Sequence, residues 1–376
     1  IFDKLLDDQV QFVLTALDSG AFADEARATL DYVLSDLRDA SGAFVAGMRS
    51  DSLVPRDGRP QTLEGAHFQW SIAELRQILG LRLADIVAFH YRLTTEGNYV
   101  PGYNIFLAPR DIGETSVAFT TAPAEIEKML ADARRHLLAV RSVRPDPRHH
   151  TVIVTASNAR LISALARAAV RYGDPRYRDE ALRAAHALLK QNYKTGQLRR
   201  AGNVPAHARD YRAVVTAMLD LYDATFDWSW IEKAIDVRRL SEKQPPSDGV
   251  PAFMVGLVAE RPETRDTAIV TLAAITNDPK WVEEAGDALA KHPQAFVFGD
   301  PSRPDVQSLV SAARTPSGDV FLISSKGLRS RFATRMPYVG EIPLPDDVLA
   351  FAVICVERRC GSAITDPAQL AASLGQ

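Results

Sequence analysis

Three short segments in the second half of the sequence share one pattern: Tyr172-Gly173-Asp174-Pro175-Arg176-Tyr177, Thr225-Phe226-Asp227-Trp228-Ser229-Trp230 and Thr276-Asn277-Asp278-Pro279-Lys280-Trp281. In each, an Asp stands where its side chain can cap the coming helix, and an aromatic residue follows one turn later. The aromatic residues Tyr177, Trp230 and Trp281 are 53 and 51 residues apart. One helical hairpin fits in such a period. Hairpins repeated at fixed spacing indicate an array, either an open solenoid or a closed ring.

Apolar residues recur at helical spacing through most of the sequence. In the first segment they are Phe2, Leu5, Leu6, Val10, Val13, Leu14 and Leu17. The same periodicity predicts further helices over residues 23–38, 71–79, 84–93, 124–140, 158–172, 177–192, 208–224, 229–240, 264–276 and 280–291. We therefore expect a mainly helical domain over residues 1–292.

The pattern changes from about residue 293. Ala295–Phe298 and Val320–Ile323 resemble strands, and Pro304–Arg314 between them resembles a helix, which gives a βαβ-like unit. A last strand is expected within Leu349–Val356 and a short helix near Pro367–Leu374. The sequence predicts a small α/β extension over residues 293–376, packed on the helical domain.

Two stretches lack helical periodicity, residues 41–70 and 94–123. Both are rich in Gly, Pro, Thr and Asn. We expect long loops there, and long loops in compact domains are usually functional or disordered.

Composition narrows the class of protein. The chain has 376 residues, a formal net charge of -3 and 46% hydrophobic residues. A nearly balanced charge argues against nucleic acid as a partner. No apolar run approaches the roughly 20 residues that cross a bilayer, and no signal-peptide pattern opens the chain. We expect a cytoplasmic protein with no membrane partner. The first residue is Ile1 rather than Met, which leaves open whether residues precede it.

The common catalytic motifs are absent from the sequence. There is no GxxxxGK, HExxH or GxSxG pattern, so ATP-driven, zincin and serine-hydrolase chemistry lose their usual support. Four residues separate Cys355 from Cys360, unlike a CxxC redox pair, and we expect both to be structural. No metal site and no cofactor are expected.

The loop from Glu64 to Trp70 combines a carboxylate, the imidazole of His67 and an indole. Pockets for sugars and polar metabolites use this mixture for hydrogen bonding and stacking. The alternative is a packed histidine beside aromatic residues, which is the commoner arrangement.

Polar residues also gather at predicted helix starts. His207, Asp210 and Tyr211 lie at the entrance of the helix over 208–224, and Asn158 opens another helix. Asp210 can cap its helix, or, in a ring of hairpins, face the central cavity as an acid or base. Asn158 has the same two interpretations. In the second long loop, Asn98, Tyr103 and Asn104 serve either backbone geometry or a site.

Several segments together resemble the helical region of the thioredoxin-domain-containing protein family of the spermatogenesis-associated protein 20 type. They are Phe2–Asp8, Glu64–Trp70, Gly97-Asn98 with Asn104, Asn158–Ala166, Asp210-Tyr211, Leu219–Asp227, and Cys355 to Cys360 followed by Thr365-Asp366-Pro367. The resemblance implies an (α/α)6-type toroid similar to N-acylglucosamine 2-epimerases and some glycosidases. Full-length members also carry a thioredoxin-like domain, which we expect to be absent from this chain.

The sequence departs from the family pattern at several polar positions. The acidic run that corresponds to residues 48–52 keeps one carboxylate of three, Asp51, and the run at 150–159 has lost its acids, its Lys and its Trp. A third departure lies near residues 262–265. The carboxylates that can still face a cavity are those of Asp51, Glu64 and Asp210.

Our leading hypothesis is a divergent toroid that binds a small polar or carbohydrate-like ligand in its central cavity, with isomerase-, epimerase- or hydrolase-like activity altered or lost. The expected catalytic residues are Asp210, Glu64 and His67. The expected ligand-binding residues are Asp51, Trp70, Asn98, Asn104, Asn158, His207 and Tyr211. Two alternatives stay open: a non-catalytic interaction module with a thioredoxin-like protein partner, and a new reaction on an apolar substrate.

Overall fold

The structure is a computed structural model of the chain. It describes residues 3–56, 59–145, 147–194, 196–243, 262–285, 287–314, 318–345 and 348–375. Ile1 and Phe2, which begin the first predicted helix, lie outside this set, as do the side chains at 262–265 where a departure from the family pattern is expected.

The chain divides into two compact units. Unit 1 consists of Ile1–Gln9, Asp31–Arg38 and Phe44–Val152. Unit 2 consists of Val10–Leu30, Asp39–Ala43 and Ile153–Gln376. The helices α1 (Leu6–Ser19) and α2 (Ala23–Asp36) contribute residues to both units.

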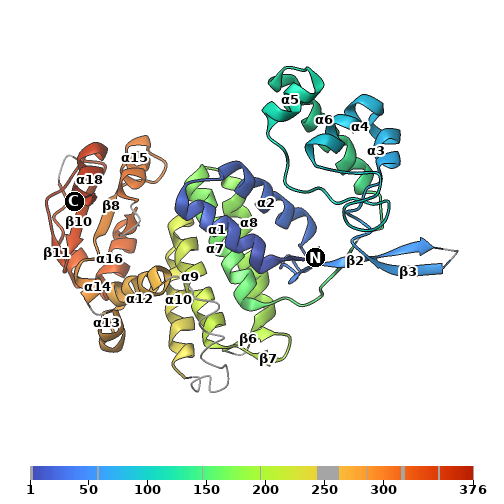
Figure 1. The fold of residues 1–376 in the computed structure, drawn as a ribbon. Helices are drawn as coiled ribbons and strands as arrows, with labels where there is room; N and C mark the ends of the chain where they lie inside the picture. The colour runs from blue at the N-terminus through green and yellow to red at the C-terminus, as the bar shows by residue number, and fades with distance from the viewer. Residues whose placement is uncertain are drawn as a thin grey trace. The chain divides into compact units, whose positions relative to one another are not determined.

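A β-hairpin is the first feature of unit 1. Strand β2 (Gly47–Arg56) pairs antiparallel with β3 (Arg59–Glu64) (Figure 1). Strands β1 (Lys4–Leu5) and β4 (Pro147–His149) also pair with β2. The expectation of a loop throughout residues 41–70 was therefore wrong. Five of the six residues of β3 are exposed, so this strand carries no alternation of apolar and polar residues for a sequence pattern to detect.

Four helices complete unit 1: α3 (Ile72–Leu79), α4 (Leu81–His90), α5 (Ile112–Phe119) and α6 (Pro123–Arg141). Their core gathers buried residues that include Trp70, Leu75, Ile86, Ile126 and Leu130. Helix α5 falls within the second predicted loop, so that expectation was also wrong for residues 112–119. A side-chain cap, in which the Gly113 amide donates to Asp111 Oδ1 at 2.6 Å, begins this helix.

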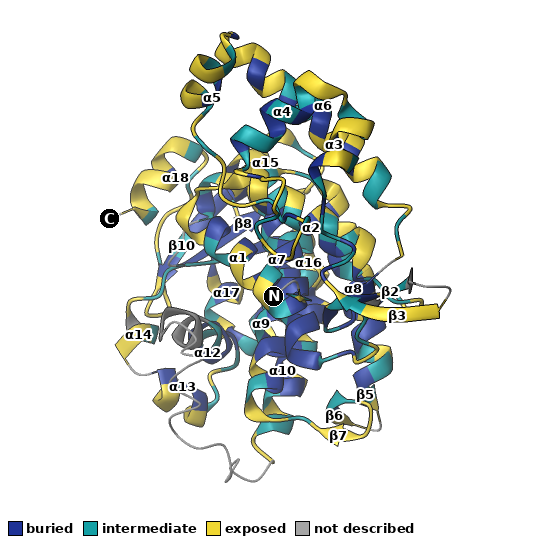
Figure 2. Cartoon of the chain, turned by 45° about the vertical axis from the view of Figure 1, so that its right-hand side comes forward, coloured by how far each residue is buried: buried dark blue, intermediate teal, exposed yellow. Residues whose placement is uncertain are grey.

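Unit 2 is built on helical hairpins: α7 (Thr155–Tyr172) with α8 (Pro175–Asn192), and α9 (Ala208–Thr225) with α10 (Trp228–Ser241). Helix α7 packs against both α8 and α9. Between α8 and α9 lie the short strands β5 (Tyr193–Lys194), β6 (Gln197–Ala201) and β7 (Val204–Pro205). Figure 2 shows buried residues along α10, whereas α5 of unit 1 has Thr115 as its buried residue. The mainly helical fold is confirmed.

The repeated capping pattern is confirmed by the hydrogen bonds. Asp174 accepts from the Arg176 amide at 2.9 Å, and Asp227 accepts from the Ser229 amide at 2.9 Å. Asp278 does the same for α13 (Pro279–Ala285), where the Lys280 amide donates at 3.1 Å. The aromatic residues one turn later are buried: Tyr177, Trp230 and Trp281.

A four-stranded sheet lies at the C-terminal end, in the order β11-β10-β8-β9. Strands β8 (Gln294–Phe298) and β9 (Asp319–Ile323) are parallel and are connected through α15 (Pro304–Ala313), as the sequence predicts. Strand β10 (Phe351–Val356) runs antiparallel to β8 and turns into β11 (Arg359–Cys360). The other helices of this region are α12 (Pro262–Thr276), α14 (Asp287–Ala290), α16 (Lys326–Arg335), α17 (Pro337–Glu341) and α18 (Pro367–Leu374).

Aromatic contacts join this sheet region to the hairpins of unit 2. The rings of Trp228 and Phe332 have centroids 4.5 Å apart, and those of Tyr222 and Phe321 are 5.9 Å apart. Cys355 and Cys360 form a disulfide between β10 and β11, in agreement with a structural role. Among the helices of the described ranges, none is long and apolar enough to cross a membrane.

Candidate functional site

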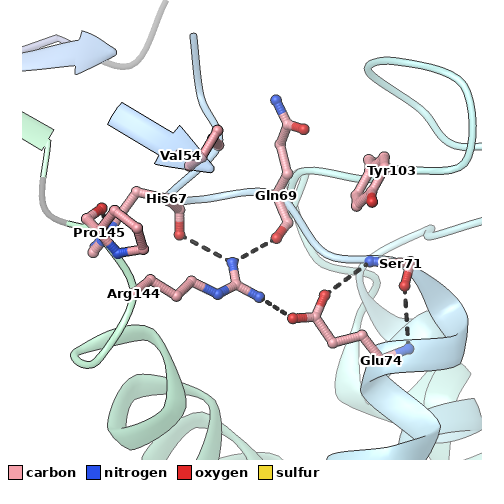
Figure 3. Close-up of a pocket in the computed structure, with 9 residues that line it drawn as sticks. Val54, His67, Gln69, Ser71, Glu74, Tyr103, Arg144 and Pro145 are labelled. Carbon is pink, nitrogen blue, oxygen red and sulfur yellow. Dashed lines mark hydrogen bonds and ion pairs between the residues drawn. The ribbon is translucent and has the colours of Figure 1, made fainter. Parts of the chain in front are cut away.

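A cavity of about 360 Å³ lies within unit 1. It is bounded by the hairpin strand β2, the loop before α3, the first turn of α3, the second long loop and the segment after α6 (Figure 3). The lining residues are Val54, Ala66, His67, Gln69, Ser71, Glu74, Tyr103, Arg144 and Pro145.

Arg144 holds the loop that carries His67. Its Nη1 donates to the backbone carbonyls of His67 at 3.1 Å and Gln69 at 2.7 Å, and its Nη2 pairs with Glu74 Oε1 (Figure 3). The guanidinium also lies over the ring of Trp70, with 3.8 Å between Cζ and the ring centroid. Because a planar guanidinium presents several fixed donors, one side chain contacts the loop at three points and helix α3 at a fourth.

Glu74 links this network to helix α3. The Ser71 Oγ accepts from the Glu74 amide at 3.1 Å, and the Ser71 amide donates to Glu74 Oε2 at 3.4 Å, which is a capping box. The same carboxylate therefore caps a helix through one oxygen and pairs with Arg144 through the other. The floor of the cavity is thus anchored to the first turn of α3.

His67 is buried in the cavity wall. Its Nδ1 lies 3.2 Å from the carbonyl oxygen of Pro145, and its ring meets the ring of Phe68 edge to face at 4.9 Å. In the neutral imidazole, the Nδ1–H donates to this carbonyl and Nε2 carries the lone pair. A ring held in this tautomer can act as a hydrogen-bond acceptor or as a base at Nε2.

The structure brings two predicted carboxylates together on the hairpin. Asp51 of β2 and Glu64 of β3 are directly opposite each other in the antiparallel register. Such pairs place their Cβ atoms roughly 4.5–5.5 Å apart on one face of the ladder. Asp51 is buried and pairs with Arg49 at 3.0 Å, whereas Glu64 is exposed. Gln69 donates to the Glu64 carbonyl at 3.0 Å, which ties the hairpin to the cavity loop.

Asn98 and Asn104 organise the second long loop. Asn104 Oδ1 accepts from the amides of Thr94 and Asn98 at 2.9 and 3.1 Å. Asn98 in turn accepts from the Ile105 amide at 2.9 Å and donates to its carbonyl at 3.0 Å. Both side chains thus fix backbone geometry, and they position Tyr103, whose residue surface is 47% exposed, in the cavity wall.

Gly97 permits the tight turn of the same loop. Its φ is +86°, and a Cβ there would lie 2.4 Å from the carbonyl oxygen of Val100 and 2.5 Å from that of Tyr103. A side chain would therefore collide with backbone. The conformation that presents Tyr103 depends on this glycine.

The remaining predicted residues lie in unit 2. Asp210 is fully buried, and its Oδ1 accepts from the Ala156 amide at 3.1 Å while Oδ2 accepts from the His207 amide at 2.9 Å. These amides belong to the starts of α7 and α9, so one carboxylate caps two helices. Arg200 lies 3.6 Å from the same carboxylate.

Three further predicted residues surround these helix starts. Asn158 is buried and donates to the Val154 carbonyl at 3.0 Å. Tyr211 is also buried, and burial raises the pKa of its hydroxyl. His207 is exposed and precedes α9. The predicted residues therefore form two sets: Asp51, Glu64, His67, Trp70, Asn98 and Asn104 in unit 1, and Asn158, His207, Asp210 and Tyr211 in unit 2.

Sequence reasoning missed the residues that organise the cavity, Arg144 and Glu74. The pattern Ser71-x-x-Glu74 before an apolar run is a capping-box signature, so the sequence does carry a local signal for Glu74. Arg144 stands in an Arg- and Pro-rich segment that gives no signal for its contacts. Among the described residues, no group of three or more His, Cys, Asp or Glu side chains is placed to hold a metal ion.

Comparison with known proteins gives one set of relatives. No family model matches the chain. It is 24% identical to spermatogenesis-associated protein 20 of Homo sapiens over 98% of this chain and 57% of the relative, and 24% identical to that of Rattus norvegicus over 100% and 58%. It is 25% identical to the uncharacterized protein B0495.5 of Caenorhabditis elegans over 64% of this chain and 38% of the relative. The chain is homologous to spermatogenesis-associated protein 20, and it spans a little over half the length of that relative.

Proposed function

We propose that this chain binds a small polar, carbohydrate-like ligand, and that the cavity of unit 1 around His67 is its site. One observation carries the proposal. An imidazole, an amide and a phenol line one cavity of about 360 Å³, on loops that Arg144 and Asn104 hold in place. Ligand pockets are commonly about 300–1,000 Å³ and combine apolar walls with a few fixed polar groups.

The wall chemistry suits a hydroxyl-rich ligand. Gln69 offers both a donor and an acceptor, and His67 offers an acceptor at Nε2, so hydroxyl groups can be recognised in either direction. Tyr103 is 47% exposed and offers a ring face for stacking. Val54 and Pro145 complete an apolar boundary.

Acid–base chemistry is a further part of the proposal. Such chemistry on a sugar uses two titratable groups on either side of the reacting bond. Glu64 and Asp51 face each other across the hairpin that leads into the His67 loop. Neither carboxylate lines the cavity, so in this proposal only His67 exchanges a proton with the bound ligand, Glu64 and Asp51 support the hairpin beside it, and isomerase- or hydrolase-like activity is retained in part or lost.

We also propose that the helical hairpins belong to an (α/α)6-type toroid of the thioredoxin-domain-containing family. The homology to spermatogenesis-associated protein 20 and the packing of α7 against α8 and α9 support this arrangement. In it, Asp210 fixes the starts of α7 and α9, His207 and Tyr211 are close to it in the sequence, and Asn158 lies in the first turn of α7.

A calorimetric screen tests the proposal. The full chain is titrated with a panel of monosaccharides and N-acetylated sugars, and the best-bound sugar is measured again with Gln69→Ala. The matched control is Gln77→Ala, an exposed glutamine of α3 that does not line the cavity. We expect a loss of affinity of about fivefold for Gln69→Ala, since one hydrogen bond contributes about 1 kcal/mol, and no change for the control. Equal effects of both variants would falsify the assignment of the cavity.

The two alternative functions give different outcomes. If the chain is a non-catalytic module with a thioredoxin-like partner, we expect no sugar to bind. A thioredoxin-like protein should then co-purify in a stoichiometric amount when the chain is isolated from the cells that naturally produce it. A reaction on an apolar substrate predicts that apolar compounds of the panel bind and that Gln69→Ala leaves their affinity unchanged.

A further inference from the structure

A second cavity, of about 340 Å³, lies in unit 2, apart from every residue discussed as a candidate above. Helices α12, α13, the segment around α14, strand β8, helix α17 and the turn between β10 and β11 contribute to it. The lining residues are Ala274, Val282, Leu289, His292, Gln294, Tyr338, Glu357 and Arg358.

The cavity has two chemically different sides. Ala274, Val282 and Leu289 form an apolar wall, and each comes from a different helix. The other side is polar and consists of the amide of Gln294, the phenol of Tyr338 and the guanidinium of Arg358. An amphipathic small molecule matches such a division, because its apolar body and its polar end each find a suitable surface.

Gln294 is the strongest indication of a ligand. It is 4% exposed and begins a strand whose other four residues are apolar and buried. Its Oε1 accepts from the Tyr338 hydroxyl, while its Nε2 lies 4.0 Å from the thioether sulfur of Met336. A thioether is a weak acceptor, and a buried amide without a good acceptor is costly. A ligand oxygen in the cavity would supply a strong acceptor for this amide.

Arg358 supplies positive charge at the same cavity. It stands in the two-residue turn between β10 and β11, where Glu357 and Arg358 have φ of 50° and 63°. The disulfide between Cys355 and Cys360 closes the base of this turn. The Arg358 Nη2 donates to Asn277, and a guanidinium has five N–H donors, so it can contact Asn277 and an anion together.

The nearby acidic groups do not cancel this attraction. Asp319 pairs with His292 at 2.9 Å and accepts from the Thr271 hydroxyl at 2.7 Å. Burial opposes protonation of His292, but the charge and hydrogen bond of Asp319 outweigh it and raise its pKa, which favours the ion pair. Glu357 and Arg358 are both exposed, so water screens both charges, and Arg358 contributes mainly through its hydrogen-bond donors.

We infer that this cavity binds a small carboxylic acid with an apolar body. The carboxylate accepts from Gln294 Nε2 and from the guanidinium of Arg358, and the apolar body packs on Ala274, Val282 and Leu289. A carboxylate meets both donors at once, and its hydrogen bonds are stronger than those of a neutral acceptor because it is charged.

Calorimetry on the full chain tests this inference, with 3-phenylpropionate as the probe and 3-phenylpropionamide as its neutral counterpart. We expect the acid to bind at least about tenfold more tightly than the amide, and Arg358→Gln to remove that difference, since a charge-assisted hydrogen bond contributes about 1.5–3 kcal/mol. Arg359→Gln is the matched control, because it makes the same change of charge on the exposed next residue of the hairpin, which does not line the cavity. Equal affinities for acid and amide, equal effects of the two arginine variants, or no saturable binding would each overturn the inference.

A second variant locates the apolar body. Val282→Phe adds volume to the apolar wall, and we expect it to weaken the acid and the amide by the same factor while the circular dichroism of the chain stays that of the parent. If Val282→Phe folds normally and both probes keep their affinities, the ligand lies elsewhere and the inference fails.

Discussion

Arg144 and Trp70 stack on each other, with the guanidinium Cζ 3.8 Å from the centroid of the indole. The same guanidinium reaches two carbonyls of the loop that carries His67 and one oxygen of Glu74. Trp70 is 4% exposed, so the pair joins the core of unit 1 to the wall of its cavity. The geometry of the candidate site therefore depends on a residue that is not expected to react.

Arg144→Lys tests this dependence. Lysine keeps the charge but has neither the planar fork nor the stacking surface. We expect the free energy of unfolding to fall by about 2 kcal/mol, because the lysine ammonium replaces only part of at least two charge-assisted hydrogen bonds. Urea denaturation measures this loss. Arg135→Lys is the control, because Arg135 is 73% exposed and contacts its neighbour Asp132; a loss of the same size there would show that Arg144 has no special role.

Asp210→Ala tests the double cap in unit 2. One cap contributes about 1 kcal/mol, and Asp210 serves two helices from a fully buried position. We expect a loss of about 3 kcal/mol by chemical denaturation, because buried amides at two helix starts lose their acceptor. Asp227→Ala removes a cap from one helix and should cost about 1 kcal/mol. Similar losses for the two variants would contradict the structural account of Asp210.

Asp220 gives a prediction on pH. Burial raises the pKa of this carboxyl to about 6, although Arg167 and the Ser163 hydroxyl favour the charged form. The folded chain therefore holds a proton at Asp220 that the unfolded chain releases near pH 4, so this group makes stability fall as pH rises from about 4 to about 6.

Asp220→Asn removes that titration. A rise in pKa from about 4 to about 6 corresponds to about 3 kcal/mol, and we expect roughly half of it, because the side chain is half-buried and water screens part of the effect. As the pH rises from 4 to 7, the free energy of unfolding of the variant should increase by this amount relative to that of the parent. Asp179→Asn, at an exposed site, should show no such trend. A parallel pH dependence of parent and Asp220→Asn would show that Asp220 does not titrate in this range.

The disulfide between Cys355 and Cys360 should stabilise the hairpin that carries Arg358. Cross-links across so short a loop restrict the unfolded chain by about 2 kcal/mol. We expect dithiothreitol, a dithiol that reduces the bond to two thiols, to lower the melting temperature of the parent and to weaken its binding of 3-phenylpropionate. The double variant Cys355→Ser with Cys360→Ser should not respond to dithiothreitol. Unchanged melting of the reduced parent would mean that the disulfide does not constrain the fold.

Local signals in the sequence account for the parts of the fold that were predicted. Asp174 and Asp227 cap helices through amides two residues away, and such short-range chemistry can be recognised without any tertiary information. The buried aromatic residues that follow them repeat with the hairpins. Strands β8 and β9 and helix α15 were also predicted from local signals, because their apolar runs are distinct from the helical periodicity before them.

Long-range contacts explain what was missed. Arg144 lies 70 residues from Glu74 and 77 from His67 along the chain, so no local pattern records the network that shapes the cavity. Strand β3 is almost entirely exposed and its pairing depends on β2, which leaves no apolar alternation to detect. The double role of Asp210 likewise depends on an amide 54 residues away.

The central claim is that a small polar ligand occupies the cavity beside His67, and the affinity of the best-bound sugar for Tyr103→Ala measures it most directly. Tyr103 lines the cavity and is 47% exposed, whereas Tyr99 of the same loop is 38% exposed and does not line it. The account predicts a loss of about tenfold for Tyr103→Ala, from an aromatic contact of about 1.4 kcal/mol, and less than about twofold for Tyr99→Ala. Equal affinities of the two variants and the parent would contradict it.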